Sequence, residues 1–440
     1  MKKLLVLTLV IIFALPFLFS CGGNGDDDKD ISDTEVTFDE DGFAIFPEGD
    51  YLTDMKFATD EYLPDYDADI SFQNSLNYGD ATVCSDSDTV YFTILKQVEY
   101  PTYVRIYTQI MYYDKNTAIT SVLCGKPECM HDDDTCNAYI SGFVYGFGIY
   151  DGKLYYIADD YSSKYNETCL FRMNLDGTAR EKVKILDQET FMSGPYTLFH
   201  RGYIYILGDY EWIEDGEEKR RQYLIAEPLG DGETVTLFDT EEGTSGKYSW
   251  VGARMAVSGK SIYLLLGDDE FCDIYRWDAQ TMQRETLCHL DATSLCWDHG
   301  FLPVSDGIYF SVYDVNYDGS DFGRRGGICK YSYDTGELGE YIWPKTDDGR
   351  DAELWPDLTE NYIVSWQGDF RVWDLSGNFI FSSIDEIDFG SSSFMGADSE
   401  NVYIWFNDID EETFTEYNIY VVVPLDGSDV VVIGQDQPEL

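Results

Sequence analysis

Three cysteines and one histidine lie close together in the sequence, in the pattern C-x4-C-x-H-x4-C. They are Cys124, Cys129, His131 and Cys136. Three thiolates and one imidazole form a ligand set that tetrahedral zinc takes in structural sites. The spacing departs from the usual C-x2–4-C knuckle, but the number and softness of the donors fit the metal. The segment is therefore a candidate structural zinc site.

The same cluster allows two other interpretations. In an oxidising compartment, two of the thiols would pair as a disulfide more readily than bind metal. A catalytic Cys–His pair would need an oxyanion hole and an orienting third residue, and the sequence shows neither. Pro127 and the run Asp132–Asp134 cannot continue a central strand, so we expect a compact knuckle. We expect a covalent or metal cross-link to hold this loop in one conformation, with a disulfide favoured over zinc.

A second candidate ligand set is the run DVNYDG, which begins at Asp314 and fits the first half of a calcium-binding loop. Asp314, Asn316 and Asp318 would supply oxygen ligands on alternate residues, and the Gly would allow the sharp turn. The twelfth position, where an EF-hand requires Glu, is Arg325. The run is a calcium loop of another type or a solvated hairpin tip, and the second is favoured in so acidic a chain.

The first twenty residues have the pattern of a secretory signal peptide. A short basic start precedes an apolar run from Leu4 to Phe19 that Pro16 interrupts. The run ends in Leu18-Phe19-Ser20-Cys21, which resembles a bacterial lipobox, in which the Cys is acylated and becomes the mature N-terminus. An uncleaved membrane anchor is the alternative, but the run is marginal in length. We expect removal of residues 1–20 and lipid anchoring of Cys21 on the extracytoplasmic side of the cell membrane.

The chain of 440 residues carries 83 acidic and 29 basic residues, a formal net charge of −54. This charge repels nucleic acid, anionic lipid and polyphosphate, so we expect no nucleic-acid partner and membrane contact only through the N-terminal lipid. Cations, cationic peptides, neutral glycans and other proteins remain as partners. Residues 21–75 are acidic and weakly patterned, which indicates a tether and an N-terminal segment with one plausible strand at Phe43–Phe46.

Beyond residue 80, a tight turn and a Tyr-rich strand recur with a period of about 52 residues. The copies begin at Asp88, Asp151, Arg201, Gly259, Asp306, Glu360 and Glu400. A second Gly-containing turn follows in most repeats, as in Leu175-Asp176-Gly177. Alternating strands between such turns are typical of hairpins, and four strands in each of seven repeats predict an all-β, seven-bladed β-propeller of four-stranded antiparallel blades.

The repeats place the propeller at residues 76–434 and leave 435–440 as a C-terminal tail. We expect helix in less than about a tenth of the chain, and a solenoid of meanders is the rival architecture. Innermost strands are predicted at Phe143–Ile149, Met255–Val257 and Phe394–Ala397, where small residues suit a crowded centre. The last repeat supplies its own outer strand at Val430–Ile433, which leaves the mode of ring closure open.

The repeats resemble bacterial TolB-like, YVTN-like and quinoprotein-dehydrogenase-like propellers through their Asp-Gly-x-Ile-Tyr-Tyr turn and strand. The segment Leu123–His131, which continues to Cys136-Asn137-Ala138-Tyr139, is similar to a Cys/His element that recurs in uncharacterised propeller lipoproteins of Clostridia-type bacteria. The resemblance covers about residues 80–434. It implies the propeller fold and attachment to the cell membrane as a lipoprotein, and it implies no activity.

The connections between predicted strands differ in length between the two faces of the ring. Those joining first to second and third to fourth strands are short. Long connections, on the opposite face, are Asp159–Thr168, Gly208–Arg221, Tyr313–Gly327, Asn407–Glu416 and the inter-blade stretch Cys124–Gly142. Because long loops on a rigid scaffold carry most sites, we expect any site, including the Cys/His knuckle, on this long-loop face.

The other cysteines and histidines indicate structure rather than chemistry. Cys169, Cys272 and Cys329 fall on third strands of their repeats, and Cys288 with Cys296 is the second candidate disulfide. Three histidines lack paired ligand spacing, namely His200, His289 and His299.

No nucleophile elbow, phosphate loop or zinc-protease helix occurs in the sequence. We therefore expect a binding or scaffold module for a protein, a peptide or a neutral glycan. The alternative is an extracellular glycan-active hydrolase or lyase that uses carboxylates on the long-loop face.

Overall fold

The computed structural model describes residues 36–435, apart from 53, 74–81, 101, 162–166, 188–194, 215–216, 241–252, 268–270, 292–299, 315–324, 347–348, 350–355, 366–369, 383–391, 411–414 and 427. Residues from Thr37 onward form one compact unit. The predicted signal segment, Cys21 and most of the tether lie outside the described residues. Asn316, Asp318, Cys296 and His299 also lie outside them.

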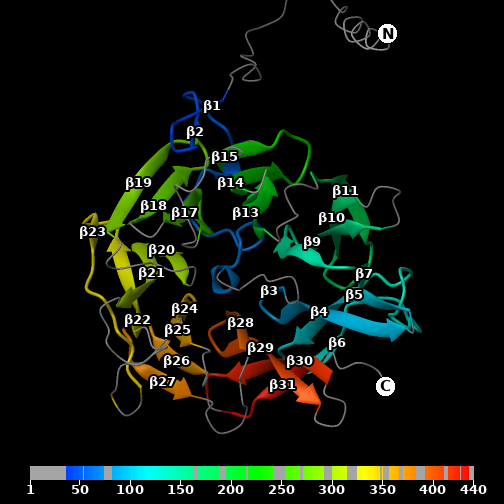
Figure 1. The fold of residues 1–440 in the computed structure, drawn as a ribbon. Coiled ribbons are helices and arrows are strands. Elements are labelled where there is room, and N and C mark those ends of the chain that lie inside the picture. The colour runs from blue at the N-terminus through cyan, green and yellow to red at the C-terminus, as the bar shows by residue number, and fades with distance from the viewer. Residues whose placement is uncertain are drawn as a thin grey trace, which may run out of the picture. The chain divides into compact units, whose positions relative to one another are not determined.

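Seven antiparallel sheets, each built on four consecutive strands, follow one another along this unit and surround a common centre (Figure 1). The first sheet also includes a short fifth strand, β7 (Tyr139–Ser141). Each blade is a meander of consecutive strands, and in blades 1 to 6 the first strands of successive blades contact one another around the centre. The prediction of an all-β, seven-bladed propeller is confirmed.

Blade 1 comprises β3 (Val83–Ser85), β4 (Thr89–Tyr100), β5 (Tyr103–Asp114) and β6 (Ile119–Val122), and blade 2 comprises β8 (Val144–Tyr150), β9 (Lys153–Asp160), β10 (Glu167–Asn174) and β11 (Glu181–Ile185). Blade 3 comprises β12 (Tyr196–His200), β13 (Tyr203–Glu214), β14 (Glu217–Pro228) and β15 (Val235–Asp239). Blade 4 comprises β16 (Arg254–Ser258), β17 (Ser261–Gly267), β18 (Phe271–Asp278) and β19 (Arg284–Asp291). Blade 5 comprises β20 (Phe301–Val304), β21 (Gly307–Asp314), β22 (Arg325–Ser332) and β23 (Glu337–Leu338). Blade 6 comprises β24 (Asp357–Leu358), β25 (Tyr362–Ser365), β26 (Arg371–Asp374) and β27 (Phe379–Ser382). Blade 7 comprises β28 (Ser392–Ala397), β29 (Asn401–Asp410), β30 (Thr415–Pro424) and β31 (Val431–Gln435).

A separate hydrophobic cluster fills each of the seven interfaces between neighbouring blades. A blade in the ring is therefore covered on both faces, and its strands must be apolar on both. This requirement explains the Tyr, Ile and Val that dominate the repeats, since β-branched and aromatic residues suit a pleated and buried surface. Each fully buried large side chain stabilises the fold by about 1.5–3 kcal/mol.

Among the strands that the structure describes, none is shared between the first and last blades. β31 comes from the last repeat itself and is the outermost strand of blade 7. Side chains close the ring instead, since the rings of Phe92 and Tyr420 lie 5.7 Å apart across the junction. Lys115 pairs with Asp398 at 3.0 Å across the same junction.

The innermost strands carry small residues because neighbouring blades approach closely there. A side chain at Gly148 of β8 would meet the Phe199 ring at 2.7 Å, and one at Gly146 would meet the Thr197 hydroxyl at 2.4 Å. Glycine at these positions lets β12 pack directly on β8. The predicted innermost strands correspond to β8, β16 and β28.

Aspartates shape many of the short turns. Asp86 accepts hydrogen bonds from the backbone N–H groups of Asp88 and Thr89, at 2.9 and 2.7 Å. Asp374 accepts in the same way from Ser376 and Asn378, each at 2.9 Å. Such Asx turns replace backbone hydrogen bonds at the strand ends, so part of the acidic composition has a structural role.

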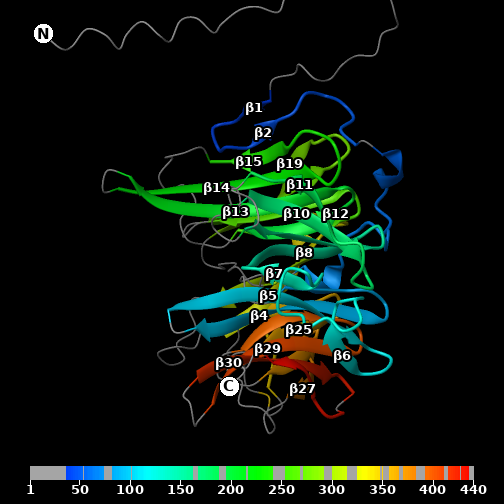
Figure 2. The ribbon, with the colours of Figure 1, turned by 90° about the vertical axis from the view of Figure 1, so that its right-hand side faces the viewer.

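Two of the predicted long loops are strands. β13 and β14 pair continuously from Tyr203↔Pro228 to Glu214↔Glu217, and β29 with β30 from Asn401↔Pro424 to Asp410↔Thr415. The expectation of loops at Gly208–Arg221 and Asn407–Glu416 was wrong, because a hairpin that projects into solvent needs no apolar face. Figure 2 shows these hairpins and β4–β5 projecting on one side of the ring.

The N-terminal strap, residues 37–73, crosses the opposite face, on which the short turns lie (Figure 2). It contains β1 (Thr37–Phe38), β2 (Ala44–Ile45) and 3-10 turns at Met55–Phe57 and Ile70–Phe72. The strand predicted at Phe43–Phe46 is thus β2, and Phe43 packs on Phe238 of blade 3 and Tyr275 of blade 4. Among the described residues helix is limited to these 3-10 turns. The same residues contain no helix with the length and hydropathy to cross a bilayer.

A buried arginine holds the strap on the ring. Arg201, in the turn between β12 and β13, donates to both carboxylate oxygens of Asp67, and both side chains are at most 3% exposed. It also donates to the carbonyls of Phe57, Thr59 and Glu61. A planar guanidinium with five donors satisfies this arrangement, which a lysine ammonium cannot.

Replacement of Arg201 by Ala should destabilise the protein strongly, because the Asp67 carboxylate would remain buried without its partner. The expected loss is about 3–5 kcal/mol of unfolding free energy. Arg172→Ala is the matched control, since the exposed Arg172–Glu181 pair contributes less than about 1 kcal/mol. Thermal and urea unfolding of the two variants would be compared, and similar losses would contradict the role of the buried pair.

His200 packs beside this pair in its neutral form. The Ala68 backbone N–H donates to His200 Nδ1 at 3.1 Å, so Nε2 carries the hydrogen and donates to the Gly259 carbonyl at 2.8 Å. Burial lowers the pKa of His200 from 6.5 to about 4, although the nearby Asp67 carboxylate opposes the shift. Protonation of Nδ1 would break the hydrogen bond from the strap.

Stability should therefore fall between pH 6.5 and 4, because the unfolded chain binds a proton at His200 that the folded chain excludes. The loss is on the order of 3 kcal/mol over this window. His200→Gln should flatten the dependence of the unfolding temperature on pH in this range. The control is His289→Gln, which removes an exposed histidine. An equally steep dependence in His200→Gln and the wild-type chain would refute the assignment.

Candidate functional site

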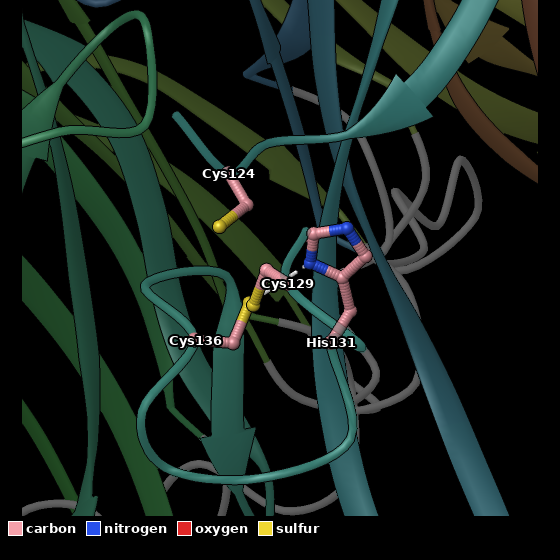
Figure 3. Close-up of side chains that lie close together, drawn as sticks. All are labelled: Cys124, Cys129, His131 and Cys136. Carbon is pink, nitrogen blue, oxygen red and sulfur yellow. Dashed lines mark hydrogen bonds between the residues drawn. The ribbon is translucent and has the colours of Figure 1, made fainter. Parts of the chain in front are cut away.

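The four residues of the Cys/His knuckle, residues 124–138, converge in the structure (Figure 3). The donor atoms of Cys124, Cys129, His131 and Cys136 all lie within 4.8 Å of one another. His131 Nδ1 is 3.2 Å from Cys136 Sγ. The three cysteines are free thiols, Cys136 is buried, and the other three residues are half-buried. The structure thus brings together every member of the predicted set.

The knuckle interrupts the outer strand of blade 1. β6 pairs with β5 at Met111↔Val122, and β7 (Tyr139–Ser141) resumes pairing with the same strand at Gln109↔Tyr139. The chain therefore leaves the sheet edge after β6, forms the knuckle and returns to the edge.

Its position corrects the expectation that the knuckle lies on the long-loop face. It packs against the β10–β11 turn of blade 2, and that turn belongs to the short-connection face. The sequence did not reveal that the outer strand continues beyond the knuckle as β7, with three residues.

Backbone geometry in the knuckle directs N–H groups toward sulfur. Glu128 and His131 have positive φ angles of 63° and 61°, which non-glycine residues rarely adopt. Burial alone would raise the pKa of the Cys124 thiol, but the backbone N–H groups of Lys126 and Asn137 and the neighbouring thiols outweigh it and lower the pKa. Burial raises the pKa of Cys136 to about 12.

Polar contacts tie the knuckle to blade 2. The Asn137 amide donates to the Gly177 carbonyl at 2.7 Å, and Arg180 donates to the Tyr139 carbonyl at 2.6 Å. Gly177 has a φ of 76°, and a side chain there would meet the Leu123 carbonyl oxygen at 2.5 Å. The Gly of the repeated Leu-Asp-Gly turn is thus required for close approach of the knuckle.

The other described cysteines are buried in the inter-blade clusters. Cys169, Cys272 and Cys329 lie on the third strands β10, β18 and β22, as predicted. Burial raises the pKa of Cys169 and of Cys329 to about 11. Cys288 lies on β19, and its predicted disulfide partner Cys296 is outside the described residues, so that pairing stays a prediction.

Two other groups of acidic residues could supply metal ligands, but the described residues support a metal site at neither. Asp314 ends β21, whereas Asn316 and Asp318 lie outside the described residues, so the calcium loop stays a prediction. Asp160 and Glu167 lie near the Cys169 thiol, but the Lys182 ammonium is 2.9 and 3.5 Å from these two carboxylates. Lys182 thus already neutralises the negative charge of Asp160 and Glu167 that would attract a metal ion.

A cavity of about 690 Å³ opens on the short-connection face, between the strap and the turns of several blades. Apolar walls come from inner strands, with Phe147 and Phe199 among the lining residues. Its carboxylates are Asp65, Asp67, Asp69, Asp86, Glu360, Asp398 and Glu400. Among the described residues that line it, Lys115 is the one cation, and it is paired with Asp398. The pocket is therefore strongly acidic.

The pocket carboxylates divide into structural and exposed groups. Burial alone would raise the pKa of Asp398, but hydrogen bonds from the Tyr403 hydroxyl and the Glu400 backbone N–H, with the Lys115 ammonium, lower it. A general acid requires a shift in the opposite direction. Asp65, Glu360 and Glu400 are exposed at the pocket and can face a ligand.

Sequence reasoning missed this pocket. Its walls come from turns hundreds of residues apart, and from a strap whose path over the ring no periodicity reports. The repeated acidic turns, at Asp86 to Asp88 and Asp398 to Glu400, were the available signal. They lie together only because the antiparallel meander of each blade places its first-to-second and third-to-fourth connections on the same face of the ring.

No protein-family model and no curated protein matches the chain. Solved structures similar to it include an acylaminoacyl peptidase from Pyrococcus horikoshii, at 13% identity and a TM-score of 0.45, with 82% of this chain and 54% of that chain covered. Oligopeptidase B from Leishmania major follows at 9% identity and a TM-score of 0.43, with 83% and 50% covered. The propeller domain of the Trilobed protease from Pyrococcus furiosus, which has an open velcro topology, shows 10% identity and a TM-score of 0.43, with 80% and 95% covered.

The chain spans about half the length of the first two peptidases. At these identities and scores the similarity carries no inference about activity. The fold conclusion rests on the seven sheets themselves.

Proposed function

We propose that the chain is a lipid-anchored, extracytoplasmic binding propeller whose acidic pocket takes a cationic peptide or protein segment. The observation that carries the proposal is the pocket of about 690 Å³, which seven carboxylates line. Asp67 is paired with Arg201 and Asp398 with Lys115, and the other five exceed the cations of the described lining. The net charge of −54 adds a long-range field that attracts such a ligand and repels nucleic acid. The resemblance to TolB-like and YVTN-like propeller lipoproteins of Clostridia-type bacteria supports the proposed lipid anchoring on the extracytoplasmic side of the membrane.

The pocket suits a peptide better than a neutral glycan. A lysine or arginine side chain can lay its methylene stem against Phe147 or Phe199 and bring its charge to the exposed carboxylates. A neutral sugar would gain nothing from the excess of charge. The glycan-active enzyme that remains the alternative needs one carboxyl with a raised pKa, and the pKa of Asp398 is lowered.

Tetralysine should bind the full chain, and removal of three exposed pocket charges should weaken that binding. The variant is Asp65→Asn, Glu360→Gln and Glu400→Gln combined. Its Kd should rise about tenfold, because exposed charge pairs contribute about 0.3–0.5 kcal/mol each. Isothermal titration calorimetry at two salt concentrations would measure this, with Nε-acetylated tetralysine as the uncharged probe.

The matched control removes three exposed acids at the outer edge of blade 5, through Asp334→Asn, Glu337→Gln and Glu340→Gln. It should leave the Kd close to that of the wild-type chain. An equal loss in both variants would show that tetralysine binds the general surface charge, and the pocket proposal would fail.

The anchor is tested at Cys21, which lies outside the described residues. Cys21→Ser should release the chain from membranes or block its processing, because the acylated sulfur would be missing. Partitioning into the detergent phase would measure this. Cys84→Ser, which changes a buried thiol of the ring, should keep the wild-type partitioning. Detergent-phase recovery of the Cys21→Ser chain at the wild-type level would rule out the lipobox.

A further inference from the structure

We propose that Cys124, Cys129, His131 and Cys136 bind one structural zinc ion that fastens the outer edge of blade 1 to blade 2. The four donors already lie within 4.8 Å of one another, and two of them are 3.2 Å apart. Zinc bonds of about 2.3 Å to sulfur and 2.0 Å to nitrogen separate the donors of a tetrahedral site by about 3.5–3.8 Å. A shift of less than about 1 Å by each side chain therefore completes the site.

The ligand count indicates a structural ion. Four protein donors fill the tetrahedron and leave no open position for water or substrate, which a catalytic zinc requires. The donors come from one short loop, and Cys136 is 1% exposed, within the cluster between blades 1 and 2. The metal would thus lie beside the hydrophobic interface and not in the acidic pocket.

Zinc explains more of the knuckle than a disulfide does. A disulfide would join two of the three sulfurs and leave the third beside His131 with no function for either. Backbone N–H groups of Lys126 and Asn137 reach Cys124, and that of Ala138 reaches Cys136. The positive φ angles of Glu128 and His131 are a strain that four metal bonds can hold.

The ion would couple two blades. Asn137 and Arg180 connect the knuckle to the β10–β11 turn, and Gly177 packs directly on Leu123 and Cys124. Loss of the metal should release the knuckle and, through these contacts, loosen the turn at Asn174–Arg180. The equivalent turn of blade 6, Asp374–Asn378, packs on Ile342 and Pro344 and not on the knuckle, so it should be unaffected.

The first experiment measures metal and thiols in the full chain, purified without chelator. Elemental analysis should give one zinc per chain, and X-ray absorption should show three sulfur neighbours and one nitrogen neighbour. Thiols of the knuckle should react with a thiol reagent only after chelation. Peptide mapping should show no disulfide that involves Cys124, Cys129 or Cys136.

Variants separate a bound zinc from zinc collected by the acidic surface. Cys129→Ala should lose the ion, whereas Cys129→His should keep it, because imidazole replaces thiolate in tetrahedral sites. Cys84→Ala, which removes a thiol outside the knuckle, should also keep it. If Cys129→Ala does not fold, the metal content and absorption spectrum of the wild-type chain still decide the proposal.

Hydrogen exchange tests the coupling. Chelation should raise exchange in residues 124–138 and 174–180 and leave residues 374–378 unchanged. A disulfide without metal, three free thiols without metal, iron in place of zinc, or full zinc content in Cys129→Ala would each overturn the proposed site. An unchanged 174–180 segment would overturn the coupling. None of these outcomes depends on whether the pocket binds tetralysine.

Discussion

Side-chain packing between blades is the constraint on which the structure depends. Each blade supplies all four of its own strands, and in the described part of the chain no hydrogen-bonded strand joins the first repeat to the last. Seven apolar clusters, one at each interface, hold the ring, and Phe92 against Tyr420 closes it. The N-terminal strap adds further contacts across one face. Arg201 donates a hydrogen bond to Asp67 of the strap, and the Gln73 side chain forms two hydrogen bonds with the backbone of Val257.

Both candidate sites follow from this construction. The antiparallel meander of each blade places its short turns at one end of the ring, and the strap borders a cavity among them. The Cys/His knuckle lies at the outer edge of the same face, where blade 1 meets the β10–β11 turn. One face thus carries the acidic pocket near the centre and the Cys/His knuckle at the outer edge, while the extended hairpins project on the other face.

The negative charge has two roles that composition alone cannot separate. At Asp86 and Asp374 the carboxylate caps a turn by accepting backbone N–H groups, so its charge belongs to the fold. At Glu360 and Glu400 the carboxylate is exposed at the pocket, so its charge is available to a ligand. Only the hydrogen-bond partners distinguish the two, and these depend on where each turn meets its neighbours.

The sequence by itself determined the fold class, the blade count and the membership of the Cys/His cluster. Local periodicity carries this information, because turn residues and alternating strands act over a few positions, and Cys124 to Cys136 lie in one short segment. The tertiary structure alone decided that the outer strand resumes at β7, that Gly208–Arg221 is hairpin, and that Asp65 and Glu400 share a pocket. These features arise from contacts between distant repeats, and the free energy of such contacts depends on surfaces that exist only once the ring has closed.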